Sequence, residues 1–312
     1  MSGPALRGVI PPVCTPLTAA GELDVPALER LCGFLLDAGV DGIFVGGSSG
    51  EAALLTDRAR AAALTTVVGV VAGQVPVLAG AIDTSAPRVL DHARTAQRLG
   101  ADAVVATAPF YVEVSAREIG AHFRLLAGAL DRPVVAYDIP SNTGRKIPGE
   151  LVVELAHDGV IAALKDSSGD LTGFRRVLAG TRDLDFACLT GSETLADLAL
   201  LSGAHGIVPG LGNVDPHGYV RLAGHARDGD WAAARDEQRR LTELFSIITV
   251  ADAQRIGPIS AALGAFKAAL VLRGVIDHPR TCDPLSPLLP AEIERIGDRL
   301  RSAGLLPVAD LR

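Results

Sequence analysis

The sequence predicts an α/β fold, a (β/α)8 TIM barrel with a C-terminal helical extension. Two observations carry this prediction. Short apolar runs alternate with longer stretches of helical spacing, and eight such runs occur before residue 214. The length of 312 residues also suits one barrel of about 250 residues with an appendage. We expect the barrel over residues 1–214, and the last barrel helix and the extension over residues 215–312, in the same structural unit.

The eight expected strands are short and apolar, as is typical of parallel strands covered on both faces. They are Gly8–Val13, Gly42–Val45, Pro76–Ala79, Ala103–Thr107, Val134–Tyr137, Ile161–Lys165, Asp185–Thr190 and Gly206–Val208. Stretches with apolar residues on one helical face lie between them, such as Val25–Ala38, Thr56–Ala72 and Ser85–Leu99. Thr56 and Ser85 are the expected N-caps of the last two.

Glycines mark the ends of several expected helices. Gly39, Gly100 and Gly203 each follow a helical stretch and precede an apolar run. An open, doubly wound sheet is the alternative fold, but neither of the glycine-rich nucleotide loops of such sheets occurs. After residue 214 the strand pattern ends and helical spacing takes over. The helices expected in this extension are Trp231–Ile248, Ile259–Arg273 and Pro290–Ala303.

Composition excludes several classes of protein. The net charge of −7, with no run of basic residues, argues against nucleic-acid binding. Cys14, Cys32, Cys188 and Cys282 form no C-x-x-C pair and the seven histidines form no H-E-x-x-H motif, so we expect reduced, buried thiols and no catalytic metal. No stretch approaches about 18 uninterrupted apolar residues, and no signal peptide is recognisable. We expect a cytoplasmic protein that binds no membrane.

The chain has only three lysines, and one of them lies where a barrel places its chemistry. Reactive groups of barrels gather at the carboxyl ends of the strands, and Lys165 ends an expected strand just before a polar turn. A buried amine at that place can attack a carbonyl carbon to form a Schiff base, because burial favours its neutral form. Lys146 lies in a loop and Lys267 in a helical stretch, where a solvated side chain is the ordinary expectation.

Two further features lie beside Lys165 in the expected barrel. Tyr137 ends the preceding strand, about 4.8 Å away across parallel strands, and a phenol there can transfer protons. The loop 46–51, Gly-Gly-Ser-Ser-Gly-Glu, follows the second strand and is expected to open a helix. Its backbone N–H groups then suit a carboxylate. The alternative for this loop is a plain capping turn, with a serine as N-cap and Glu51 in the first turn.

Three motifs occur in this order along the chain. They are Gly47-Ser48-Ser49-Gly50-Glu51, Tyr137-Asp138-Ile139-Pro140-Ser141-Asn142-Thr143-Gly144 and Leu164-Lys165-Asp166-Ser167-Ser168-Gly169-Asp170. With them, nearly the whole chain resembles the dihydrodipicolinate synthase / N-acetylneuraminate lyase family of pyruvate-handling class I aldolases. The resemblance implies that Lys165 forms an imine with a 2-oxo acid, Tyr137 transfers protons, and Ser48 and Ser49 hold the carboxylate. It implies no separate cofactor.

The resemblance extends to other expected site residues. The segment 108–111, Ala-Pro-Phe-Tyr, is similar to a family segment whose second aromatic residue supplies a hydroxyl across a tight-dimer interface. It implies that Tyr111 is catalytic and that the protein is a homodimer or homotetramer. Ser167, Gly191 and Gly210 fall in regions that contact substrate in the family.

Departures from the family pattern bear on the substrate. Asn142 stands where the synthase branch generally has an arginine that binds the carboxylate of its aldehyde, which argues against a role in lysine biosynthesis. Asn142 and the lysine motif are more similar to the aldolases of 4-hydroxy-2-oxoglutarate and of 2-keto-3-deoxy sugar acids. Asp138 replaces a usual asparagine, and the sequence offers no interpretation of it. The paired acidic residues of the sialic-acid lyases are missing.

The sequence therefore predicts a carbon-carbon lyase that cleaves a 2-oxo acid into pyruvate and an aldehyde, or condenses the two. The expected substrate is a 4-hydroxy-2-oxo or 2-keto-3-deoxy acid, bound to Lys165 through the residues named above, including Asn142. The alternatives are a 4-hydroxy-tetrahydrodipicolinate (dihydrodipicolinate) synthase, a dehydratase that uses the same imine, and a catalytically silent barrel that binds 2-oxo acids. The aldehyde, its stereochemistry and the direction of the reaction stay open at this point.

Overall fold

A computed structural model describes residues 6–306. Its strands are β1 Gly8–Val9, β2 Ile43–Val45, β3 Val77–Gly80, β4 Ala103–Thr107, β5 Val134–Asp138, β6 Ala163–Asp166, β7 Ala187–Thr190 and β8 Gly206–Ile207. All pairs are parallel, each strand from β2 to β7 pairs with the next, and β1 pairs with β8. A parallel bridge between Pro12 and Phe44 joins the segment after β1 to β2 and closes the barrel. The predicted fold class is confirmed.

All eight expected strands occur, with shifted ends. The regular ladder of β1 stops at Val9, although Val13 still donates to the carbonyl of Phe44 at 2.9 Å. Pro11 and Pro12 lie between them and have no N–H to donate. β5 and β6 each continue one residue beyond their expected ends. Tyr137 and Lys165 are therefore the penultimate residues of neighbouring strands.

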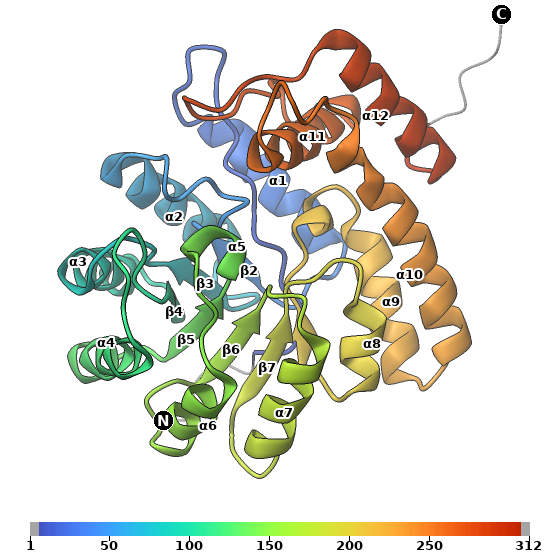
Figure 1. Ribbon diagram of the computed structural model, residues 1–312. Coiled ribbons are helices and arrows are strands. Elements are labelled where there is room, and N and C mark those ends of the chain that lie inside the picture. The colour runs from blue at the N-terminus through green and yellow to red at the C-terminus, as the bar shows by residue number, and fades with distance from the viewer. Residues whose placement is uncertain (1–5, 307–312) are drawn as a thin grey trace, which may run out of the picture.

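Helices alternate with the strands and surround the barrel (Figure 1). They are α1 Val25–Asp37, α2 Asp57–Val71, α3 Ala86–Arg98, α4 Ala116–Ala129, α5 Pro140–Thr143, α6 Gly149–His157, α7 Leu171–Thr181, α8 Ala196–Leu201, α9 Pro216–Arg227, α10 Trp231–Phe245, α11 Pro258–Leu272 and α12 Pro290–Ser302. Thr56 caps α2 by accepting the N–H of Ala59 at 3.2 Å. Ser85 is the N-cap residue of α3, as predicted, although its side chain accepts no hydrogen bond from the helix.

The expected helix stops are present. Gly39, Gly100 and Gly203 have backbone φ of 82°, 95° and 99°, and each lies between a helix and the strand that follows it. A side chain at these φ values is strained, whereas glycine adopts them freely. These turns reverse the chain so that every strand enters the barrel in the same direction.

Two apolar layers hold the barrel together. One lies between the strands and the surrounding helices, and the other fills the barrel interior. The interior layer includes Ile10, Phe44, Leu78, Val105 and Leu189, all nearly inaccessible to solvent. Tyr137 belongs to this layer, and its ring contacts that of Phe44 edge to face with centroids 6.2 Å apart. The interior is thus a packed floor beneath the carboxyl ends of the strands.

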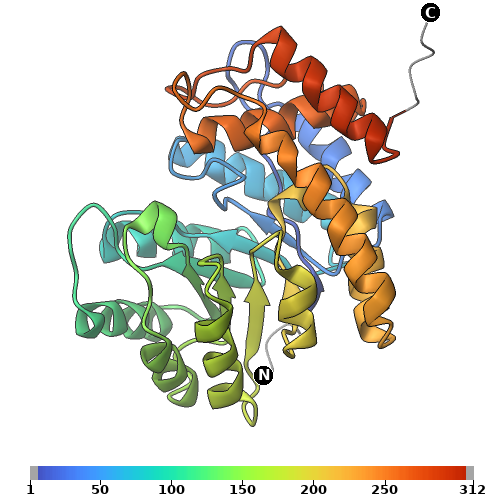
Figure 2. The same ribbon diagram turned by 45° about the vertical axis from the view of Figure 1, so that its right-hand side comes forward.

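The helices α10, α11 and α12 follow the barrel and lie together at one side of it (Figures 1 and 2). Their positions agree closely with the three helices expected in the extension. α11 is apolar and buried over most of its length, and Lys267 in its middle is completely inaccessible to solvent. The expectation of a solvated Lys267 is therefore wrong, because other elements cover this helix on several sides. No helix within residues 6–306 has the length and apolar character needed to cross a membrane.

Candidate active site

Lys165 lies at the carboxyl end of β6, above the packed barrel interior. Its side chain is 4% exposed, and its Nζ is 3.9 Å from the centroid of the Tyr137 ring and 4.8 Å from that of Phe44. A Cβ built on Gly191 would come within 3.1 Å of the Lys165 Cε, so this glycine leaves the room that the side chain occupies. The amine is therefore enclosed by aromatic rings and backbone, as the sequence predicts for a Schiff-base nucleophile.

Tyr137 is the direct neighbour of Lys165 in the β5–β6 ladder. Its hydroxyl lies 3.5 Å from the Oγ of Ser48, a long contact in which either oxygen can donate. Such contacts often shorten when a ligand binds. The structure thus brings together the amine, the phenol and the first serine of the loop 46–51, from three different strand ends.

The loop 46–51 is a series of turns and does not open a helix. α2 begins only at Asp57, because Thr56 is the residue that caps it, so the predicted helix start at this loop is wrong. Within the loop, Gly50 and Glu51 donate their N–H groups to the carbonyls of Gly47 and Ser48. The N–H groups of Ser48 and Ser49 donate to no acceptor within residues 6–306. Two adjacent backbone donors beside Tyr137 therefore remain for a carboxylate.

Glu51 connects the loop 46–51, which we call the serine loop, to residues far along the chain. Its carboxylate forms an ion pair with Lys267, both side chains are wholly buried, and its second oxygen accepts the N–H of Cys282 at 2.6 Å. Lys267 also donates to the carbonyl of Arg280 at 2.7 Å. Glu51 has a left-handed backbone with φ 58°, which is uncommon for a residue with a side chain. The pair fastens the serine loop to α11 and to the segment that follows α11.

The opposite wall of the site consists of residues after β6, β7 and β8. A Cβ on Gly191 would lie 2.1 Å from the Oγ of Ser167, and a Cβ on Gly210 would lie 3.1 Å from the Oγ of Ser49. These four of the predicted substrate-contacting residues thus form two close pairs, Gly191 with Ser167 and Gly210 with Ser49. Each glycine leaves room for the hydroxyl beside it, because a side chain there would meet that neighbour at close range.

Glu193 also lies at this wall, and sequence reasoning missed it as a site residue. One carboxylate oxygen accepts the N–H of Gly210 at 2.9 Å. Burial raises the pKa of Glu193, while the Gly210 N–H and the charge of Lys165 oppose that shift. Its position two residues after Gly191, just beyond the end of β7, is the sequence signal that could have identified it.

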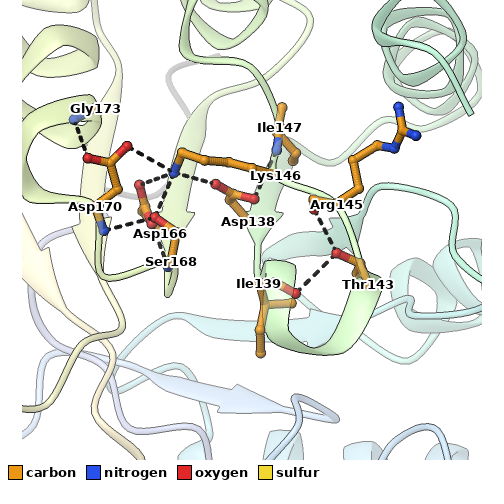
Figure 3. Close-up of polar contacts among 10 residues, drawn as sticks. All are labelled: Asp138, Ile139, Thr143, Arg145, Lys146, Ile147, Asp166, Ser168, Asp170 and Gly173. Atoms are coloured by element: carbon orange, nitrogen blue, oxygen red, sulfur yellow. Dashed lines mark hydrogen bonds and ion pairs between the residues drawn. The ribbon is translucent and has the colours of Figure 1, made fainter.

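Lys146, set aside by sequence reasoning as a loop residue, lies among carboxylates behind the catalytic strand ends (Figure 3). Its Nζ is 3.0 Å from an oxygen of Asp138, 3.6 Å from one of Asp166 and 3.9 Å from one of Asp170. It also donates to the Oγ of Ser168 at 2.6 Å. The two nearest acids directly follow the catalytic candidates in sequence, so Lys146 joins the ends of β5 and β6 on the side away from the barrel interior.

Asp138 has a second partner in this cluster. Its other carboxylate oxygen accepts the backbone N–H of Ile147 at 3.0 Å (Figure 3). Burial raises the pKa of Asp138, and the bonds from Ile147 and Lys146 oppose the shift. The aspartate that the sequence left without interpretation is thus the acidic partner of Lys146.

Two predicted site residues are exposed in the single chain. Tyr111 is 94% exposed and has a left-handed backbone with φ 76°. Asn142 lies in the short helix α5 after β5, and its side-chain oxygen accepts the hydroxyl of Ser141 at 2.9 Å. Asn142 and Ser48 line one common cavity. Asn142 thus reaches the mouth of the site from within the chain, whereas Tyr111 does not.

The four cysteines are free. Burial raises the pKa of Cys14 and of Cys32 to about 12 and that of Cys188 to about 11, so these thiols are inert. Cys282 is partly exposed, which differs from the expectation that all four are buried. Within residues 6–306, no three His, Cys, Asp or Glu side chains gather in a way that suits a metal ion.

Relatives of known name resemble the chain over most of its length. It is 37% identical over 269 residues to an uncharacterized DapA-like lyase of Halobacterium salinarum, covering 86% of this chain and 85% of the relative. It is 32% identical to the 4-hydroxy-tetrahydrodipicolinate synthase of Kineococcus radiotolerans, covering 96% and 94% of the two chains. The synthase of the same name from Methanosphaerula palustris is 31% identical, with 88% and 91% covered.

Solved structures agree. The chain superimposes with a TM-score of 0.89 and 30% identity on YagE of Escherichia coli, a prophage protein of the dihydrodipicolinic acid synthase family solved in complex with pyruvate, covering 96% and 99% of the chains. It superimposes equally well, at 27% identity and with 97% and 98% covered, on a monomeric dihydrodipicolinate synthase variant. The model of the Dihydrodipicolinate synthetase family matches residues 5–301. The chain therefore belongs to this family of pyruvate-dependent carbon-carbon lyases, the class I aldolases.

Proposed function

We propose that Lys165 forms a Schiff base with a 2-oxo acid and that the protein cleaves or forms the bond between pyruvate and an aldehyde. The observation that carries this proposal is the enclosure of the Lys165 amine between the rings of Tyr137 and Phe44, beside a phenol that contacts Ser48. The pyruvate complex of the structural neighbour YagE supports it. We further propose a 4-hydroxy-2-oxo acid as the substrate, a class that includes the 2-keto-3-deoxy acids.

In the direction of condensation, the neutral amine attacks the C2 carbon of pyruvate. The carbonyl oxygen takes one proton from the amine and a second through Tyr137 and leaves as water, which gives a protonated imine. Loss of a proton from C3, taken up through Tyr137, gives an enamine. The enamine carbon attacks the aldehyde carbon, and the aldehyde oxygen takes a proton through Tyr137 and Ser48. Water then hydrolyses the imine and frees Lys165. Cleavage follows the same steps in reverse.

The remaining site residues hold the pyruvate unit. The two unpaired N–H groups of Ser48 and Ser49 suit its carboxylate, and charge-assisted bonds from backbone N–H groups are among the stronger ones in proteins. Gly191 lies beside Ser167 and the Lys165 side chain, and Gly210 lies beside Ser49. We propose that Glu193 joins them, since its carboxylate accepts the N–H of Gly210 at this wall.

Borohydride reduction in the presence of pyruvate tests the proposal. We expect a single stable adduct, which peptide mass spectrometry assigns to Lys165, and no adduct in Lys165→Ala. Lys146→Arg is the control and should give the wild-type adduct. An adduct on another residue, or none with the wild-type protein, would sink the mechanism. Adduct formation without turnover of any 2-oxo acid would instead favour the catalytically silent barrel.

A second candidate is 4-hydroxy-tetrahydrodipicolinate synthase. The names of the relatives from Kineococcus and Methanosphaerula favour it. Asn142 argues against it, because a neutral amide stands where a cation would bind the carboxylate of aspartate semialdehyde. Pyruvate and aspartate semialdehyde in an assay coupled to a dihydrodipicolinate reductase distinguish the two candidates.

We also propose that the protein assembles as a homodimer or homotetramer. Tyr111 combines a left-handed backbone with an almost fully exposed ring. Such a backbone costs about 1–3 kcal/mol and persists where surrounding contacts hold it. A second subunit packed on the segment after β4 would provide those contacts.

We propose that the protein is cytoplasmic, because its free cysteines fit the reducing conditions of that compartment.

A further inference from the structure

A cavity of about 320 Å³ opens at the mouth of the barrel next to Ser48. This volume falls within the range of small-molecule sites, about 300–1,000 Å³. Ser48 contacts the Tyr137 hydroxyl, and Thr107, another lining residue, is the direct neighbour of Tyr137 in the β4–β5 ladder. The cavity therefore begins where the proposed bond to the aldehyde is made and broken.

Most of the cavity wall is apolar. Its large apolar side chains come from the ends of three strands, from α11 and from the segment after α11, and they are Ile82, Phe110, Ile139, Ile259, Leu263 and Leu285. Leu54, Ala52 and Ala53 continue this surface. No Arg, Lys or His lines the cavity among the described residues, and the one acid, Glu51, is already paired with Lys267. A carboxylate on the bound aldehyde would thus lose its water without gaining a cation.

One polar group in the wall has no partner. The side chain of Thr107 is 3% exposed, and its Oγ1 forms no hydrogen bond within the described residues. Buried hydroxyl groups are nearly always hydrogen-bonded, so an unpaired one that lines a cavity indicates a ligand atom. The hydroxyl of Thr143, by contrast, already donates to the carbonyls of Ile139 and Arg145. The other polar side chains of the wall are those of Ser48, Asn142 and Thr143, and their oxygens already take part in hydrogen bonds within the described residues. The hydroxyl of Thr107 is therefore the buried one that is left for a ligand close to Tyr137.

We propose that this cavity binds the aldehyde and selects an uncharged one with an apolar chain, whose oxygen bonds to the Thr107 hydroxyl. Chains with a carboxylate or several hydroxyl groups are disfavoured, because the apolar wall leaves them unpaired. This inference rests on the proposed lyase function. Within the class of 4-hydroxy-2-oxo acids, it favours those with a hydrocarbon chain beyond C4 over the polyhydroxylated sugar acids.

Three aldehydes of four carbons each, assayed with saturating pyruvate, test the proposal. Butanal is apolar, succinic semialdehyde carries a carboxylate, and erythrose carries three hydroxyl groups. We expect kcat/KM for butanal to exceed that of each of the others by at least about tenfold. Higher kcat/KM for erythrose or succinic semialdehyde, or no turnover of butanal, overturns the proposal.

Two substitutions sharpen the test. Thr107→Val should lower kcat/KM for butanal about tenfold, and Thr107→Ser, which keeps the hydroxyl, should restore most of it. Asn142→Arg should raise kcat/KM for succinic semialdehyde and leave that of butanal lower or unchanged. Unchanged kinetics of Thr107→Val would overturn the role of its hydroxyl.

The borohydride adduct distinguishes a failure of the proposed aldehyde selection from a failure of the proposed lyase function. If wild type and Thr107→Val both form the pyruvate adduct on Lys165 but the aldehyde preference is reversed, the selection of an apolar chain is wrong and the lyase function stands. If no adduct forms on Lys165, the proposed function itself fails.

Discussion

At the scale of single residues, Lys146 gives the ends of β5 and β6 a common cation. Burial lowers the pKa of Lys146, but the bond to Asp138 and the charges of Asp166 and Asp170 raise it by a larger amount. The pKa of Lys146 is therefore raised overall. The amine therefore keeps its proton. An asparagine in place of Asp138, as the family resemblance leads one to expect, would place one negative charge fewer beside Asp166. Lys146 and Asp138 are thus one coupled feature of this chain.

Replacing Lys146 should expose this coupling. Lys146→Met leaves Asp138 and Asp166 without their cation, and we expect the free energy of unfolding to fall by about 1–3 kcal/mol. The lower part of that range is expected because the lysine side chain is 36% exposed. Urea denaturation followed by circular dichroism measures the change.

Asp138→Asn provides the matched background for this experiment. With one carboxylate neutralised, the further loss caused by Lys146→Met should be smaller by at least about 0.5 kcal/mol, a coupling that a double-mutant cycle reports. Equal losses in both backgrounds would show that the lysine stabilises the protein independently of Asp138.

At the scale of elements, the serine loop depends on α11 for its position. The Glu51–Lys267 pair and the bond from Cys282 lie directly behind the residues that present free N–H groups to the carboxylate. The backbone of Glu51 also donates to the carbonyl of Ser48 and accepts from the N–H of Leu54, so the side-chain contacts add a link from this turn to a distant element. An element outside the barrel proper thus positions part of the substrate site.

Glu51→Gln keeps the size of this side chain and removes its charge. Lys267 is then a buried, unpaired cation, and we expect the protein to lose about 3–5 kcal/mol of stability. The KM for pyruvate should rise several-fold in the variant that remains folded, because the loop carrying Ser48 and Ser49 is less well held. Thermal unfolding and steady-state kinetics measure the two effects.

The double variant Glu51→Gln, Lys267→Met is the control. It has no unpaired charge, so part of the stability should return, whereas the raised KM should persist. Full recovery of KM in the double variant would mean that the ion pair does not position the loop.

The sequence predicts the elements of the barrel well, but it does not predict the ion pair between Glu51 and Lys267 that holds the serine loop. Eight apolar runs with glycine helix stops suffice for the strands and their order, because a parallel strand covered on both faces leaves a local mark in the sequence. The role of Lys267 leaves no such mark. A lysine in Ala-Phe-Lys-Ala-Ala has the same local pattern whether it faces water or a distant glutamate, and only packing decides between them. The helix start expected at the loop 46–51 fails for a local reason, because Thr56 caps α2 five residues later.

At the scale of the whole molecule, some of the proposed site residues lie together within one chain, whereas Tyr111 is exposed and would act only in an assembly. Lys165, Tyr137 and Ser48 come together within one chain, and the motifs that predicted them are local. Glu193 and Thr107 were missed because neither belongs to a motif and each acquires its significance from its neighbours. The role proposed for Tyr111 depends on a second copy of the chain.

The assembly is testable by mass. Sedimentation equilibrium of the wild-type protein should give two or four times the chain mass of 32.2 kDa, and Tyr111→Ala should shift the protein toward the single chain. Tyr111→Phe should keep the assembly and lower kcat by about 10²-fold, the size expected for loss of a proton-transferring hydroxyl. A wild-type monomer with full activity would contradict both the assembly and the role of Tyr111.

The anchor of the serine loop also has a consequence for the order in which the protein is made. The carboxylate of Glu51 bonds to the backbone of a residue 231 positions later in the chain. A growing chain completes all eight strands, and with them Lys165 and Tyr137, before either partner of Glu51 has been synthesised. A nascent or truncated chain that ends after β8 thus carries the nucleophile without a fixed carboxylate loop. Substrate binding is therefore among the last properties that this polypeptide acquires.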